Sequence, residues 1–263
     1  MARIRRICED FCWLNPHLTL RLVTNGETVI DHSATDTNWH KWRPRDPTSP
    51  HWYDYQRFER YMAAFVARSL KGTNPNMTVR EFISQFRGLT STIKQKRVLR
   101  QLGAAHMPLV KFFGSAKQVN EEQIAKLLEV MKAETEPVKP KLLGVIGKEH
   151  LLRMFEAAGG IAKTFKYLKT VKDDGGVPRV MEAMFGLHES DDDNVKRRTI
   201  AGVNWSAGIE DPFRSLGSEG LGFTSSLEQA LVSSSDPVFA FLHVACPRIA
   251  FRDRGKSSID VED

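Results

Sequence analysis

Two groups of basic residues are the parts of this 263-residue chain best suited to chemistry with phosphate groups. The first centres on Lys256, in the basic loop 252–256 that follows an apolar run at 238–246. That run is short, rich in aromatic and β-branched residues and opened by Asp236-Pro237, so it predicts a buried strand. A lysine on a loop held by such a strand could place a point charge against a phosphate. The alternative is an ordinary surface lysine at the end of a strand.

The second group lies on a helix that the sequence predicts over residues 91–101. Its basic residues spread over a broad face of the helix, which suits contact with a phosphate backbone better than reading of base edges. They are Lys94, Lys96, Arg97 and Arg100. We expect neutralising all four to weaken DNA binding evenly across sequences and to reduce its dependence on salt. The alternative is a structural helix with a solvated basic face.

The distribution of charge favours an anionic partner. Residues 1–111 contain 18 Lys and Arg against 9 Asp and Glu, whereas the remainder has 20 against 23. A basic half in an otherwise near-neutral chain is typical of proteins that bind nucleic acid. A well-solvated basic surface with no nucleic-acid partner is the other interpretation.

The composition predicts a cytoplasmic protein without a membrane partner. No apolar stretch approaches the roughly 20 residues that span a bilayer, and no apolar segment follows the basic start. Three cysteines, Cys8, Cys12 and Cys246, show no metal-binding spacing and no disulfide framework, as expected in a reducing compartment.

The first half of the chain predicts a hairpin followed by helices. Asn25-Gly26 separates two runs of strand character, 18–24 and 28–30, and is a strong hairpin signal. A Pro- and Trp-rich connector follows over 31–53, because closely spaced prolines exclude regular structure. Helices are then predicted at 54–70, at 78–86 behind a capping box of Thr78 and Glu81, at 91–101 and at 120–131.

The second half predicts mixed α and β structure. Helices are expected at 148–158, 162–171 and from Ser225 to Val232, and strands at 179–187, 198–205 and 238–246. This order predicts two layers, a sheet and its helices. In the first half, the apolar segment 11–17 leads into the hairpin and is expected to end in a turn.

The acidic residues of the second half are candidates for a metal or acid–base site. Glu182, Glu189 and the run Asp191–Asp193 precede a basic Lys-Arg-Arg triplet, so a solvated loop between strands is favoured. His243 lies in the middle of a predicted strand and is interpreted as a core residue. No phosphate-binding loop, catalytic Gly-x-Ser-x-Gly or His-Glu-x-x-His sequence occurs.

Taken in order, these features resemble the B-type subunit of type IIB DNA topoisomerases (topoisomerase VI). Three stretches of the chain carry the resemblance, at the end of the ATPase domain, in the helix-two-turn-helix domain and at the end of the transducer. The matching residues are Asn15, Pro16 and His17; Thr78, Arg80, Glu81, Phe82, Phe86 and Lys94; and Asn204, Pro237, His243, Val244, Ala245, Phe251 and Lys256.

The resemblance implies an α+β fold in three segments. Residues 1–45 would be the terminal strands of a GHKL-type ATPase domain, with a small β-hairpin. Residues 46–135 would form a helical, helix-two-turn-helix-like domain. Residues 136–263 would form a two-layer α/β transducer that resembles ribosomal protein S5 domain 2.

The resemblance also implies a function. Lys256 would sense the γ-phosphate of ATP, with ATP and Mg²⁺ held by an ATPase domain supplied elsewhere. DNA and a DNA-cleaving A-type subunit would be the other partners. The expected role is to couple ATP binding to DNA handling as part of an ATP-dependent isomerase.

Several family features have no counterpart in the sequence. They are the Glu-x-x-x-Asn-x-x-Asp-Ala helix of the nucleotide pocket, the glycine-rich lid, the Trp-Lys-x-Tyr segment and the long C-terminal helix. We therefore expect either a split or truncated gene product or a divergent relative, inactive alone. The rival prediction is a non-catalytic DNA-binding or scaffold module with no link to ATP.

Overall fold

A computed structural model shows a mixed α+β fold that divides into two compact units. It describes residues 1–43, 45–72, 76–115, 118–189, 196–208, 210–214, 222–252 and 258–260. The first unit, here the α/β unit, comprises Met1–Trp42, Lys139–Asp174 and Pro178–Asp263. The second, here the helical unit, comprises Arg43–Val138 with Gly175–Val177.

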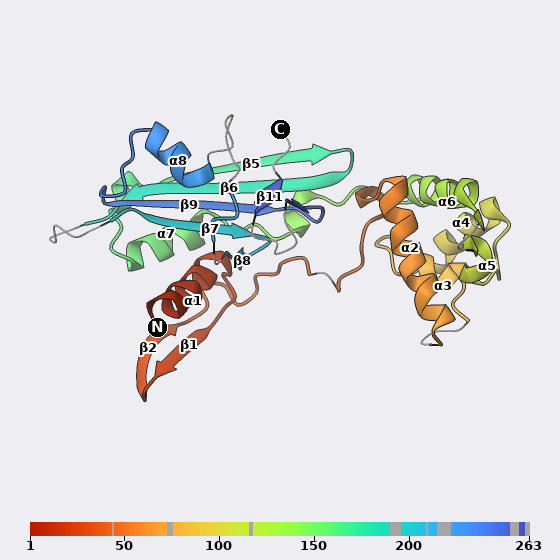
Figure 1. Ribbon diagram of the computed structural model, residues 1–263, viewed down its shortest axis with the longest axis horizontal. Coiled ribbons are helices and arrows are strands. Elements are labelled where there is room, and N and C mark those ends of the chain that lie inside the picture. The colour runs from red at the N-terminus through yellow and green to blue at the C-terminus, as the bar shows by residue number, and fades with distance from the viewer. Residues whose placement is uncertain are drawn as a thin grey trace. The chain divides into compact units, whose positions relative to one another are not determined.

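The α/β unit is built on a five-stranded mixed sheet (Figure 1). Its strands are β5 (Lys166–Asp174), β6 (Val177–Leu187), β7 (Arg198–Val203), β8 (Ser206–Ala207) and β9 (Val238–Ala245), in the order β5-β6-β9-β7-β8. β9 runs antiparallel to β6 and parallel to β7. Every residue of β9 is buried, as its continuous apolar sequence predicts for a central strand covered on both faces.

One face of the sheet is covered by α1 (Ala2–Leu14) and α7 (Lys148–Ala157). The side chain of Phe155 on α7 fills the space over Gly186, where an added Cβ would overlap the ring. Leu14 occupies the space over Gly202 in the same way. Glycine is therefore needed at both strand positions, because the helix side chains approach the strand backbone directly.

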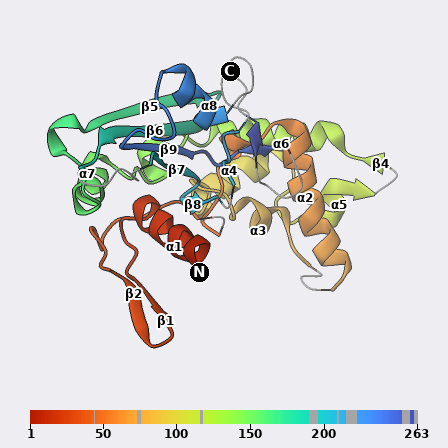
Figure 2. The same cartoon turned by 60° about the vertical axis from the view of Figure 1, so that its left-hand side comes forward.

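The opposite face is covered by α8 (Gly222–Gln229), which Figure 2 shows on the side of the sheet away from α1, and by the segment 210–214. Phe213 and Phe223 pack there against Leu242 and Val244 of β9. Since neighbouring residues of a strand point to opposite faces, β9 alternates between the two layers. The short elements of this unit are the hairpin β1 (Leu20–Thr24) and β2 (Glu27–His32), η2 (Pro140–Leu142), η3 (Ala162–Thr164), β10 (Ala250–Phe251) and β11 (Ile259–Asp260).

One local prediction for this unit was wrong and another was incomplete. Residues 162–171 were predicted as a helix but form η3 and then β5, where Tyr167 and the β-branched Thr170 and Val171 join the sheet. Residues 11–17 were predicted as an apolar entry that ends in a turn; the turn is present at residues 16–17, and the residues up to Leu14 form the end of α1. The hairpin at Asn25-Gly26 is confirmed, with positive φ at both turn residues.

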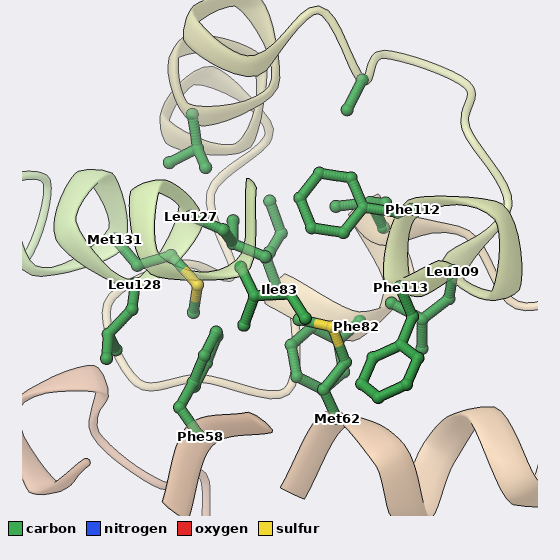
Figure 3. Packing of buried hydrophobic residues seen from close by; sticks show 14 of the residues in the cluster. Phe58, Met62, Phe82, Ile83, Leu109, Phe112, Phe113, Leu127, Leu128 and Met131 are labelled. Carbon is green, nitrogen blue, oxygen red and sulfur yellow. The ribbon is translucent and has the colours of Figure 1, made fainter. Parts of the chain in front are cut away.

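The helical unit contains η1 (Pro50–Trp52), α2 (Tyr55–Leu70), α3 (Val79–Ile83), α4 (Thr92–Leu102), α5 (Leu109–Phe113) and α6 (Glu121–Ala133). A two-stranded pair, β3 (Gly114–Ser115) and β4 (Gln118–Val119), joins α5 to α6. Phe58, Phe82 and Phe86 are fully buried and meet edge-to-face or tilted, with ring centroids 5.4–5.9 Å apart. Met62, Ile83 and Leu127 belong to the same core, where Figure 3 shows them with Phe58 and Phe82. This unit therefore has a hydrophobic core of its own.

Some helix ends of this unit are capped by side chains or by glycine, whereas Asn120, predicted to cap α6, makes no side-chain cap hydrogen bond. The Thr78 hydroxyl accepts the Glu81 N–H at 3.3 Å, and the Glu81 carboxylate accepts the Thr78 N–H at 2.7 Å. The predicted capping box is thus confirmed. Asp54 caps α2, and Gly103 ends α4 in the left-handed conformation. Across the described residues, none of the helices combines the length and the apolar character needed to cross a membrane.

Candidate nucleic-acid interface

Helix α4 presents the predicted basic residues, and its buried side fixes its orientation. Val98 and Leu99 are buried in the core of the helical unit, and Gln95 is buried beside them. The Gln95 amide donates to the carbonyl of Leu89 at 2.9 Å, which ties the helix to the loop before it. Because this side faces inward, the remaining faces of α4 carry its cationic side chains.

The four predicted residues fall into two pairs. Lys94 donates from Nζ to the Glu134 carbonyl at 2.9 Å, and the Arg97 guanidinium lies 3.5 Å from the Glu134 carboxylate. These two side chains therefore help to hold α4 against the end of α6. Lys96 and Arg100 are exposed, and no ion pair with another described residue involves them. They lie one helical turn apart on the same side of α4.

The charge of the whole helical unit supports an anionic partner. Its main segment, residues 43–138, contains 16 Lys and Arg against 9 Asp and Glu. A positive surface of this kind attracts phosphate polymers without reading sequence. In the part of the chain that the structure describes, no group of three His, Cys, Asp or Glu side chains is placed to hold a metal ion.

Lys256 lies outside the described residues. The strands that flank its loop, β10 and β11, pair with Ala250 opposite Asp260 and Phe251 opposite Ile259. The implied role of Lys256 toward ATP and Mg²⁺ therefore stays a prediction that rests on the resemblance. Asp191–Asp193 also fall outside the described residues.

Glu182 belongs to a buried polar cluster in the α/β unit, on the strand predicted at 179–187, and not to the solvated loop favoured for the acidic residues. Glu182 lies on β6 directly opposite His243 on β9, and both side chains are fully buried. Oε1 accepts from the Tyr167 hydroxyl and from the Gly147 N–H, each at 2.8 Å. Oε2 accepts from the Ile146 N–H at 3.0 Å and lies 3.4 Å from His243 Nδ1.

The contacts of this cluster define its protonation. His243 Nε2 accepts the backbone N–H of Trp205, so the proton of the ring is on Nδ1, toward Glu182. Burial lowers the pKa of His243, which keeps the imidazole neutral. Burial by itself would raise the pKa of Glu182, but its hydrogen bonds from His243, Gly147 and Ile146 lower it overall. The cluster is thus an ionised carboxylate held by four donors.

A second network joins the chain before the helical unit to the sheet. The side chain of the buried Asn15 donates to the carbonyl of Trp205 at 2.9 Å and accepts from Lys41 Nζ. The Trp205 indole N–H donates to the Gly144 carbonyl, and Lys41 lies 5.9 Å from its ring. Burial lowers the pKa of Lys41. These residues hold segments 15–42 and 143–147 on the sheet.

The sequence interpretation missed both networks, although part of the signal was present. His243 was correctly interpreted as a core residue, and a second polar residue in the middle of an apolar strand, Glu182, was available as its partner. Asn204, interpreted as a marker of the fold, forms two hydrogen bonds with the backbone of Cys246. The functional interpretation of the site therefore rests on α4, and the buried clusters are structural.

No protein-family model matches the chain, and a search of curated proteins finds no significant match.

Proposed function

We propose that this chain binds DNA through its phosphate backbone as a non-catalytic part of an assembly similar to topoisomerase VI. The observation that carries the DNA-binding part is the exposure of Lys96 and Arg100 on one side of α4, without intramolecular ion pairs among the described residues. The excess of basic over acidic residues in segment 43–138 supports it. Exposed cations without partners gain most from phosphate contact, because no internal contact is lost.

The assembly part of the proposal rests on the sequence resemblance and on the order of elements. Apart from the two-residue strand β8, the order along the chain is β6, β7, α8 and β9, as expected for a transducer that resembles ribosomal protein S5 domain 2. In this proposal Lys256 would reach the γ-phosphate of ATP bound, with Mg²⁺, to an ATPase domain supplied elsewhere. A DNA-cleaving A-type subunit would be a further partner.

The test compares two double variants that remove the same charge. Lys96→Gln/Arg100→Gln removes exposed cations, whereas Lys94→Gln/Arg97→Gln removes cations that already contact Glu134. Binding to two unrelated DNA duplexes is measured by fluorescence anisotropy at several salt concentrations. We expect the first variant to weaken binding to both duplexes and to lower the slope of log K against log [salt] by about 2, since each lost phosphate contact accounts for about 0.9.

The Lys94→Gln/Arg97→Gln control should change that slope by less than half as much, although it removes the same formal charge. Equal binding by wild type and the Lys96→Gln/Arg100→Gln variant would show that α4 is structural and would favour the scaffold alternative. The isolated chain should not hydrolyse ATP, and Lys256→Ala should leave its DNA binding unchanged. Tight ATP binding by the isolated chain would contradict the assembly part of the proposal.

A further inference from the structure

The outer edge of β7 lacks a strand partner along most of its length within the described residues. β8 pairs only with Gly202 and Val203, the last two residues of β7. The stretch Arg198–Ala201 pairs with β9 on its other side but with no described strand on this one. An unpaired strand edge presents a row of backbone donors and acceptors that can pair with another chain.

The direction of the backbone groups on β7 follows from one hydrogen bond. The Asn204 N–H donates to the Val244 carbonyl on β9 at 2.9 Å, so Gly202 and Ile200, at two-residue intervals, also face β9. Thr199 and Ala201 consequently direct their N–H and C=O groups away from the sheet. The Arg6 guanidinium bonds the Thr199 carbonyl at 3.3 Å from that outer side, which agrees with this direction.

These outward groups line a cleft of about 480 Å³, here called the edge cleft. Thr199 and Ala201 form its back, the first half of α1 forms one wall, and residues 208–211 with Phe223 form the other. Arg198 and Ile200, which face β9, are absent from its lining. The volume falls within the range of about 300–1,000 Å³ typical of ligand sites.

Arg3 and Arg6 are the cations of the edge cleft that a carboxylate of a ligand could reach. Each acidic residue of the lining already has a partner: Asp10 contacts Arg198 at 3.3 Å, Glu210 contacts Arg214 at 2.8 Å, and Asp211 accepts the Phe213 N–H. Arg3 is exposed, and no ion pair with a described residue involves it. Arg6 lies 4.0 Å from Asp10 and holds a strand carbonyl in place of a strand partner.

We propose that the edge cleft binds an extended acidic peptide segment of a partner protein, which adds to the sheet as a strand beside β7. The peptide backbone would pair with the Ala201 N–H and with the Thr199 carbonyl, from which it displaces Arg6, because the Gly202–Ala207 pairing of β7 and β8 places Gly208 opposite the Ala201 carbonyl. A carboxylate of the peptide would then contact Arg3 and the released Arg6. In such strand addition, backbone hydrogen bonds supply affinity and the flanking side chains supply selectivity.

The experiment selects decapeptides from a random displayed library against the full chain. We expect the selected peptides to contain β-branched residues and at least two Asp or Glu. Ala201→Pro removes only the outward N–H of β7, because the Ala201 N–H does not pair with β9, and should weaken binding at least ten-fold. Arg3→Glu should weaken it similarly, and peptides with Lys in place of Glu should bind that variant better than wild type.

Arg5→Glu is the matched control, because Arg5 lies on the same helix, contacts Glu9 and does not line the edge cleft. It should leave peptide binding within two-fold of wild type. If Ala201→Pro unfolds, peptides N-methylated at alternate residues test the same backbone pairing on the wild-type chain. The proposal would be overturned if no peptide is selected, or if Ala201→Pro binds the peptides as tightly as wild type does. It would also be overturned if N-methylated peptides bind as tightly as unmodified ones, or if Arg5→Glu weakens binding as much as Arg3→Glu does.

Discussion

At the residue scale, the Glu182 cluster shows how a charge is kept inside the sheet. An isolated buried carboxylate is strongly disfavoured unless hydrogen bonds replace its water. Glu182 has two donors at each oxygen, and they come from the loop before α7, from β5 and from β9. The carboxylate therefore joins three segments that are distant in the sequence.

The first prediction concerns this carboxylate. In Glu182→Gln, one carboxylate oxygen becomes an NH₂ group that faces two donors whichever way the amide turns. We expect a loss of about 1–3 kcal/mol in the free energy of unfolding, measured by urea denaturation, because buried donors are left unsatisfied. Glu189→Gln, at an exposed position, should change stability by less than about 0.5 kcal/mol. Unchanged stability of Glu182→Gln would show that Glu182 is protonated in the fold.

The second prediction concerns His150 and the dependence of stability on pH. Its ring is buried, with Nε2 3.0 Å from the Trp13 carbonyl and Nδ1 in contact with the Thr35 hydroxyl. Nε2 carries the proton, since a carbonyl can only accept. Burial lowers the pKa of His150 to about 4. A second proton would leave a charged ring in the interior.

Stability should fall as the pH is lowered, because the unfolded chain takes up a proton at His150 at a higher pH than the folded chain does. Unfolded His150 binds a proton below pH of about 6.5, and the folded residue only near pH 4, so the stability that it supports is complete above pH 6.5 and falls between the two. The difference between these two pKa values corresponds to about 3 kcal/mol. His150→Gln, which retains a donor for Trp13, should flatten the stability profile over this range, measured by urea denaturation. His40→Gln, at an exposed position, should leave the slope unchanged; a His150→Gln profile as steep as wild type would refute the assignment.

At the scale of elements, the sequence correctly predicts the structures that depend on residues close together in the chain. The hairpin at Asn25-Gly26 and the capping box of Thr78 and Glu81 each depend on residues at most a few positions apart, and both predictions are confirmed. Segment 162–171 was wrongly predicted as a helix because the partners that make it a strand lie in β6. Its Tyr167 hydroxyl bonds a residue 15 positions away.

The candidate site could likewise be predicted only as far as local sequence patterns reach. Sequence alone placed Lys94, Lys96, Arg97 and Arg100 on a helix, and the helix is present as α4. Which of them are engaged internally depends on Glu134, about 40 positions away, so only the structure separates the two pairs. The partners of Glu182, at 36 and 61 positions, are likewise invisible to local patterns.

The third prediction concerns the packing of α7 on the sheet. In Gly186→Ala the added methyl would overlap the Phe155 ring, which is fully buried and touches Phe239 and Phe165. We expect a loss of about 1–3 kcal/mol in the free energy of unfolding, because a close-packed contact must move. In a Phe155→Leu background the same change should cost less, which a double-mutant cycle measures. An additive cycle would mean that Phe155 does not restrict position 186.

At the scale of the whole molecule, the main segment of the helical unit, residues 43–138, leaves the α/β unit and returns to it at one place. The Trp42 N–H donates to the Leu143 carbonyl at 2.9 Å, and an added Cβ on Gly144 would lie 2.8 Å from the Cα of Lys41. The helical unit is therefore inserted, along the chain, between two points of the α/β unit that are in contact. Insertions of this kind are tolerated because the host unit needs no connection through the inserted one.

The last prediction is that the two units fold separately. Replacing residues 43–138 by a short Gly-Ser linker should leave the α/β unit folded, because Trp42 and Leu143 stay within hydrogen-bonding distance and no residue of the Glu182 cluster is removed. Retention of the His150-dependent pH profile would report the intact packing of that unit. The isolated fragment 43–138 should also fold, since its core lies within it, and should keep the salt-dependent DNA binding assigned to α4. Dispersed amide resonances in both proteins would bear this out, whereas collapse of either spectrum would show that the units require each other to fold.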